Sequence, residues 1–129
     1  MRIAGERGFV ELAARTAARE RGPALVIGPQ RIVSALLPVL RKRLADGHTT
    51  DVWLLGEAAE LPIPLRGTIP LARIESLFGA PAVIAIAGEA ALVGLLEQRG
   101  LEGYWTTDRA VVAATRAAAD AFTATSAGA

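Results

Sequence analysis

Four short apolar runs recur along the chain, and each stops at a small or polar residue. The runs cover residues 24–28, 51–56, 82–88 and 103–108. Runs of this length without alternating polar positions are typical of parallel strands that are buried on both faces. They predict a four-stranded, mainly parallel sheet. In such a sheet ligands bind beyond the carboxyl ends of the strands, so the ends of the four runs mark the expected functional edge.

Segments with helical spacing of apolar positions lie around and between these runs. Helices are expected over residues 6–21, 29–46, 71–78, 89–99 and 108–123. Pro38 should kink or split the second of them, because proline removes a backbone donor from a helix interior. Alternating helices and strands predict one α/β domain over residues 1–123, with three α-β-α layers in a Rossmann-like arrangement. Residues 124–129 are expected to form a frayed tail.

Composition narrows the function classes. The 129 residues are 52% hydrophobic and 21% charged, which suits one globular domain. There is no cysteine, so disulfides and thiolate chemistry are excluded. The net charge of +1 gives no general attraction to DNA or RNA, so no nucleic-acid partner is expected through this chain.

The apolar stretch over residues 80–96 is interrupted by Gly88-Glu89 and is shorter than the roughly 20 residues that span a bilayer. No signal-peptide pattern opens the sequence. These features predict a cytoplasmic protein with no membrane partner. Its arginine and alanine usage, with Lys42 as the single lysine, is typical of bacteria with high-GC genomes.

The turn after the first run has the features of an anion site. Gly28-Pro29-Gln30-Arg31 would present backbone N–H groups and a helix dipole to a phosphate or carboxylate. Arg31 would add a forked donor and Ser34 a hydroxyl. A plain strand-to-helix turn explains the same residues, and no glycine-rich dinucleotide or nucleoside triphosphate loop is present.

Polar residues also follow the other three runs. Glu89 suits either a hydroxyl-binding carboxylate or an acidic first turn of a helix, and Thr107 or Asp108 should cap the last helix. His48 is expected in a solvated loop. Arg41-Lys42-Arg43 suits either a nucleic-acid contact or a solvated helix end, and a net charge near zero without a helix-turn-helix segment favours the solvated helix end. No metal and no cofactor are expected. The candidate ligand-binding residues are Gly28, Gln30, Arg31, Ser34, Gly56, Glu57, Gly88, Glu89, Thr106, Thr107, Asp108 and Arg109.

These segments resemble the effector-binding domain of SorC-type bacterial sugar regulators, within the Rossmann-like phosphosugar binders. The segment Pro81–Gly88, then a helix, then Tyr104–Asp108 is similar to that family's third strand and its later threonine-aspartate segment. Val26-Ile27-Gly28 with Arg31 resembles its glycine turn, and Val52–Gly56 its second strand. The resemblance implies that Gly28, Arg31, Gly88 and Asp108 contact a sugar phosphate.

Three functions remain open on the sequence alone. The favoured one is a module that binds a small anionic metabolite, above all a sugar phosphate, without covalent chemistry. The second is a small isomerase or lyase that uses Glu57, Glu89 or Asp108 as acid or base. The third is an assembly subunit without a ligand. Small residues around the last helix would permit close helix–helix approach in a homo-oligomer, although packing on the chain's own sheet explains them equally well.

Overall fold

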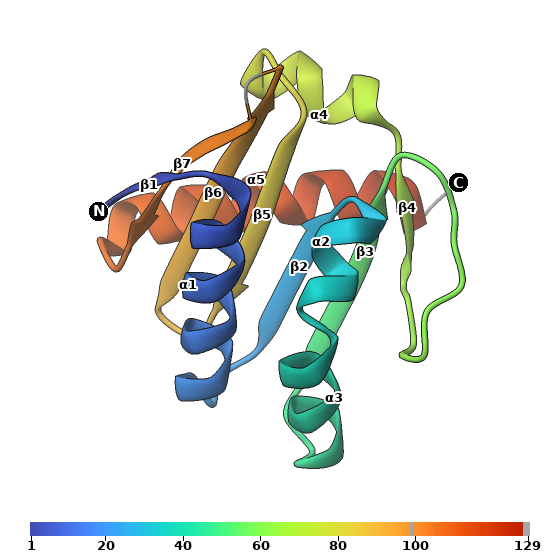
Figure 1. Cartoon of the computed structure of the whole chain (residues 1–129). Coiled ribbons are helices and arrows are strands. Elements are labelled where there is room, and N and C mark those ends of the chain that lie inside the picture. The colour runs from blue at the N-terminus through green and yellow to red at the C-terminus, as the bar shows by residue number, and fades with distance from the viewer. Residues whose placement is uncertain (99, 128–129) are drawn as a thin grey trace.

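A mixed sheet of seven strands forms the centre of the domain in the computed structural model, which describes residues 1–98 and 100–127 (Figure 1). The order across the sheet is β1-β7-β6-β5-β2-β3-β4. Neighbours from β2 to β4 are parallel, and all other neighbours are antiparallel. The strands are β1 (Arg2–Ala4), β2 (Ala24–Gly28), β3 (Thr50–Leu55), β4 (Gly67–Ile69), β5 (Ala82–Ala87), β6 (Ala90–Glu97) and β7 (Gly100–Thr106).

Helices cover both faces of the sheet. In Figure 1, α1, α2 and α3 lie in front of it and α5 crosses behind it. The buried side chains accordingly form two cores, one under α1–α3 with Phe9 and Leu40, the other under α4 and α5 with Ile74 and Phe122. The helices are α1 (Glu6–Arg19), α2 (Gln30–Ala35), α3 (Leu37–Ala45), α4 (Leu71–Phe78) and α5 (Arg109–Ala127).

Pro38 splits the predicted helix over residues 29–46, as the sequence indicates. α2 ends at Ala35 and α3 begins at Leu37, so the proline lies in the first turn of α3. A missing backbone donor costs nothing at that position, because the first N–H groups of a helix have no partner within it. The break lets α2 and α3 both pack on the sheet.

The predicted fold class is wrong. Residues 90–97 form strand β6 instead of the helix expected over 89–99, of which Arg99 lies outside the described residues. Gly88-Glu89 is a two-residue hairpin turn, and Gly88 has the positive φ of 55° that a tight turn between antiparallel strands requires. The sheet is therefore mixed and mostly antiparallel, neither a mainly parallel four-stranded sheet nor a Rossmann-like one.

The two edge strands and the end of α5 also differ from expectation. β1 and β4 have three residues each, too few for a periodic pattern to show in the sequence. α5 continues to Ala127, past the expected end near Thr123. Of the residues expected to fray, 128 and 129 lie outside the described part of the chain.

Candidate functional site

The predicted ligand-binding residues lie at two opposite edges of the sheet. β2 and β3 are parallel and end at one edge, whereas β5 runs antiparallel to β2. The turn after β5 therefore lies beside the start of β2, where the Gly88 N–H donates to the Pro23 carbonyl (3.1 Å). Thr106 pairs with Ala91 at the same edge. One group is Gly28, Gln30, Arg31, Ser34, Gly56 and Glu57; the other is Gly88, Glu89, Thr106, Thr107, Asp108 and Arg109.

Because of this separation, the residues predicted to contact a sugar phosphate cannot form one binding site. The four positions implied by the resemblance divide between the edges, with Gly28 and Arg31 at one and Gly88 and Asp108 at the other. The three carboxylates considered for acid–base work divide in the same way, since Glu57 follows β3 and the other two belong to the opposite edge. Antiparallel β5 is the cause, because it turns the third and fourth predicted strand ends away from the first two.

Four residues of the first group, Gln30, Arg31, Gly56 and Glu57, line an open crevice of about 570 Å³ at the carboxyl ends of β2 and β3. Gln30, Arg31 and Glu57 contribute its charged and amide groups, and most other lining residues are apolar. Arg31 already has an anionic partner, because its Nε donates to both carboxylate oxygens of Glu6 at 3.0 and 3.2 Å. Ser34 lies half-buried on α2, outside the lining residues. The positive charge of Arg31 in this crevice is therefore already neutralised by the Glu6 carboxylate.

In the second group, Thr106 and Asp108 form local hydrogen bonds at the start of α5. Asp108 caps α5, since its Oδ1 accepts from the backbone N–H groups of Ala110 (2.9 Å) and Val111 (3.2 Å). The Asp108 N–H in turn donates to the Thr106 hydroxyl at 3.0 Å. The predicted capping role of Asp108 is confirmed, and Thr106 belongs to the same set of hydrogen bonds.

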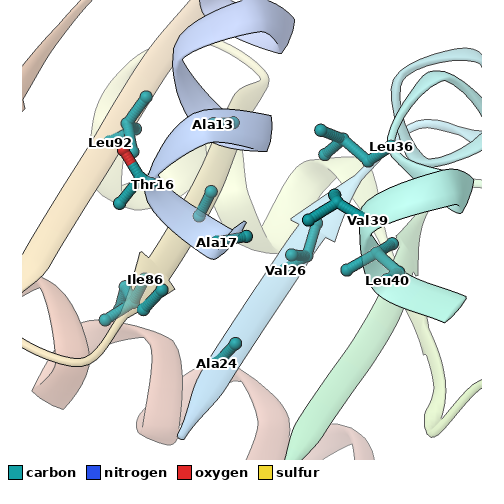
Figure 2. A pocket seen from close by; sticks show the side chains of 12 residues that line it. Ala13, Thr16, Ala17, Ala24, Val26, Leu36, Val39, Leu40, Ile86 and Leu92 are labelled. Atoms are coloured by element: carbon teal, nitrogen blue, oxygen red, sulfur yellow. The ribbon is translucent and has the colours of Figure 1, made fainter. Parts of the chain in front are cut away.

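A small cavity lies beneath α1 and α3, over β2 and β5 (Figure 2). Its volume is about 10 Å³, which is about the space that one water molecule needs. Ala17, Val26 and Leu40 are among its mostly apolar lining residues. It is a packing gap between two helices and has no room for a metabolite.

The layer formed by α1 and α3 differs from the rest of the surface in charge. Basic residues are concentrated in the part of the sequence that forms these helices, and acidic residues in the rest of the chain. Residues 1–47 contain nine basic and four acidic residues, whereas residues 48–129 contain five basic and nine acidic ones. The first part therefore carries a net charge of +5 and the second −4, and the total of +1 hides the difference. Helices α1, α2 and α3 all belong to the basic part.

Four exposed arginines of this layer form no ion pair or hydrogen bond within the described residues. Arg15 and Arg19 lie on α1, Arg21 follows it, and Arg41 lies on α3. Lys42 is also exposed, and its Nζ is 3.5 Å from the Asp46 carboxylate. We call these five residues the basic layer. None was among the predicted site residues, although the uneven charge of the two parts of the sequence was the signal that could have indicated them.

A buried arginine holds α1 and α3 together beneath this surface. Arg43 is only 3% exposed, so the prediction of a solvated helix end is wrong for this residue. Its guanidinium donates to the carbonyls of Ala17 (2.9 Å), Gly22 (2.6 Å) and Thr49 (3.3 Å), to the carbonyl of Glu20, and to the Thr50 hydroxyl (3.1 Å). Burial lowers the pKa of Arg43, and the Glu20 carboxylate opposes this shift.

A groove of about 250 Å³ separates the C-terminal ends of α1 and α3 at the surface. Arg21 and Lys42 line it from the two sides, together with Glu20 and Asp46. His48, predicted in a solvated loop, is half-buried in this groove. In the described ranges, no cluster of histidine, aspartate or glutamate residues could hold a metal ion. Nor does any described helix combine the length and the apolarity that crossing a bilayer requires.

Comparisons with known proteins identify the fold. No family model matches the chain, and no curated protein matches it. Among solved structures, it is similar to TrmBL2, an archaeal chromatin protein whose structure shows a novel mode of DNA binding. The TM-score is 0.63 at 13% sequence identity, and the match covers 91% of this chain. The chain spans about half of TrmBL2, since the match covers 48% of that protein.

These findings correct the predicted function and partners. The expectation of a small-anion module, with sugar phosphate favoured and no nucleic-acid partner, is wrong. It depended on a Rossmann-like sheet that the chain does not form. The solved structure that shares this fold belongs to a protein that binds DNA. The total charge of +1 conceals the net charge of +5 on residues 1–47, which contain the basic layer.

Proposed function

We propose that this domain binds DNA through its basic layer, by contacts to backbone phosphates and without catalysis. The observation that carries the proposal is the set of four exposed arginines on one helical layer that have no acidic partner among the described residues. The DNA-binding function of TrmBL2, which shares the fold, supports it.

Arginine is suited to this task. Its planar guanidinium presents donors that match phosphate geometry, and it stays protonated at every physiological pH. Arg15 and Arg19 are one helical turn apart on α1, about 6 Å along the axis, so both project from a similar side of that helix. Arg21 and Arg41 extend the positive surface toward α3. Arg43 fixes the two helices relative to each other, so the surface is rigid before DNA arrives.

Phosphate contacts predict weak, sequence-independent and salt-sensitive binding. Non-specific complexes of this kind have Kd values of roughly 1–100 µM at physiological salt. The logarithm of the binding constant falls by about 0.9 per phosphate contact for each unit of log salt, so four contacts predict a slope of about −3.6. Between 50 and 200 mM salt that slope corresponds to an affinity loss of roughly 150-fold.

Fluorescence anisotropy of a labelled duplex, titrated with the full chain at several salt concentrations, tests the proposal. The variant Arg15→Ala/Arg19→Ala should reduce the slope by about 1.8, because two contacts are lost. The matched control is Arg66→Ala/Arg73→Ala, which removes the same charge from the acidic part of the chain and should leave the slope unchanged. Equal losses in both double variants, or no binding at 50 mM salt, would overturn the proposal.

A further inference from the structure

The outward face of α5 lacks the polar residues that a surface helix normally presents to water. Of nine exposed positions between residues 109 and 124, seven are alanine or valine. The two others are Arg109 near the start of the helix and Asp120, eleven residues later. Neither side chain forms an ion pair within the described part of its own chain.

An apolar groove runs beside this face, between α4 and α5. Its volume is about 410 Å³, and three of the most exposed large hydrophobic residues of the described chain line it: Leu77 (59% exposed), Tyr104 (39%) and Val111 (37%). Ala114 and Ala118 of α5 complete the floor. Tyr104 also lines a second hollow over β6 and β7, which Phe78 and Leu95 line together with the ion-paired Arg2 and Glu102. Contiguous surfaces of this kind mark contacts with another macromolecule.

We propose that this face binds a second copy of the same chain, with the two α5 helices packed antiparallel about a two-fold axis. Charge complementarity identifies this occupant. Eleven residues correspond to about three helical turns, so Arg109 and Asp120 lie on nearly the same side of α5 but about 16 Å apart, too far to pair within one chain. An antiparallel partner centred between Ala114 and Thr115 brings Arg109 of each copy opposite Asp120 of the other.

The alanines make the required approach possible. A two-fold contact pairs each patch with itself, so the same surface must fit its own image. Ala113 and Ala117 lie at the outward side of the crossing, and their small side chains let helix axes approach to about 8 Å. The apolar groove that Leu77 and Ala118 line flanks this crossing within each copy. This inference does not depend on DNA binding, because the basic layer lies on the other face of the sheet.

Sedimentation velocity of the full chain across the micromolar range tests the proposal. The wild-type chain should form a dimer, and Ala117→Glu should dissociate it by burying charge at the crossing. Ala45→Glu, at an exposed position of α3, is the matched control and should leave the dimer intact. Circular dichroism should show both variants folded, since both positions face solvent in the single chain.

Charge exchange tests the antiparallel register. The dimer contains two Arg109–Asp120 pairs, and Arg109→Asp alone converts both into aspartate–aspartate pairs, so it should raise the dimer Kd roughly tenfold. Asp120→Arg alone creates two arginine–arginine pairs and should act similarly. The double variant Arg109→Asp/Asp120→Arg should return the Kd to near the wild-type value. A chain that stays monomeric, a dimer that Ala117→Glu leaves unchanged, or a double variant weaker than either single one would overturn the proposal.

Discussion

Replacing Arg43 by methionine tests whether this residue holds the layer of α1 and α3 together. Methionine keeps much of the apolar stem but removes every donor. The carbonyls of Ala17, Glu20 and Gly22 then lose their partner, since no backbone N–H in the described chain bonds to them. A buried acceptor left unpaired costs about 1–3 kcal/mol, and water from the adjacent groove can satisfy part of that loss. We therefore expect the free energy of unfolding to fall by about 3–5 kcal/mol.

Urea denaturation followed by circular dichroism measures this change, with thermal unfolding as a second readout. For a domain of this length, 1 kcal/mol corresponds to a Tm shift of about 3–5 °C, so Arg43→Met should lower the Tm by about 10–20 °C. Arg41→Met is the matched control, because Arg41 is exposed and unpaired, and it should change stability by less than about 0.5 kcal/mol. A free energy of unfolding for Arg43→Met within about 1 kcal/mol of wild type would show that Arg43 does not hold the layer together.

Three further results are expected. Asp108→Ala should lower the free energy of unfolding by about 1 kcal/mol in urea denaturation because it removes the cap of α5, whereas Asp108→Asn should cost much less; equal losses would contradict the capping role. Gly103→Ala should cost about 1–3 kcal/mol in the same assay, because the added methyl group meets the Val93 carbonyl of β6, and an unchanged stability would show that the β6–β7 contact can yield. A dimer joined through α5 carries its basic layers on opposite sides, so wild-type protein should bring two labelled duplexes together in an energy-transfer assay. Ala117→Glu should bind DNA without joining duplexes, and joining by that variant would contradict the arrangement.

The sequence predicts three of the four buried strands and predicts strand direction poorly. The apolar runs that became β2, β3 and β5 are largely buried, as their composition indicates. The fourth run lies in β7, where residues 103–106 are half-buried or exposed, so the prediction of a strand buried on both faces is wrong there. Residues 90–96 are apolar on every side, and periodicity cannot distinguish a buried helix from a strand buried on both faces in such a run. Gly94, a poor residue for a helix interior, and the Gly88-Glu89 turn were the local signals for a hairpin.

The predicted site failed because one connection, between β5 and the strand after it, was predicted as a helix and is a hairpin. With a helix between β5 and the next strand, the polar residues after all four apolar runs would have met at one edge. With a hairpin there, only the residues after β2 and β3 do. The sequence therefore indicated which residues end strands, including the cap formed by Asp108. Which strand ends share an edge depends on the hairpin, whose local signals were weak, and on the long-range antiparallel pairing of β5 with β2.

The basic layer is suited to DNA and the outward face of α5 to a second copy of the chain. Neither surface would bind the other surface's partner favourably. A two-fold contact through the basic layer would bring like charges together without apolar area to offset their repulsion, since the unpaired arginines project from both of its helices. The exposed positions of α5 carry one cation and one anion among alanines and a valine, and the half-buried Arg116 donates to the Gly88 carbonyl, so phosphate would find little attraction there. The sheet separates the two surfaces, which lie over different cores. Changes to Arg15 and Arg19 should therefore weaken DNA binding and leave the dimer intact, whereas a change at Ala117 should have the opposite effect.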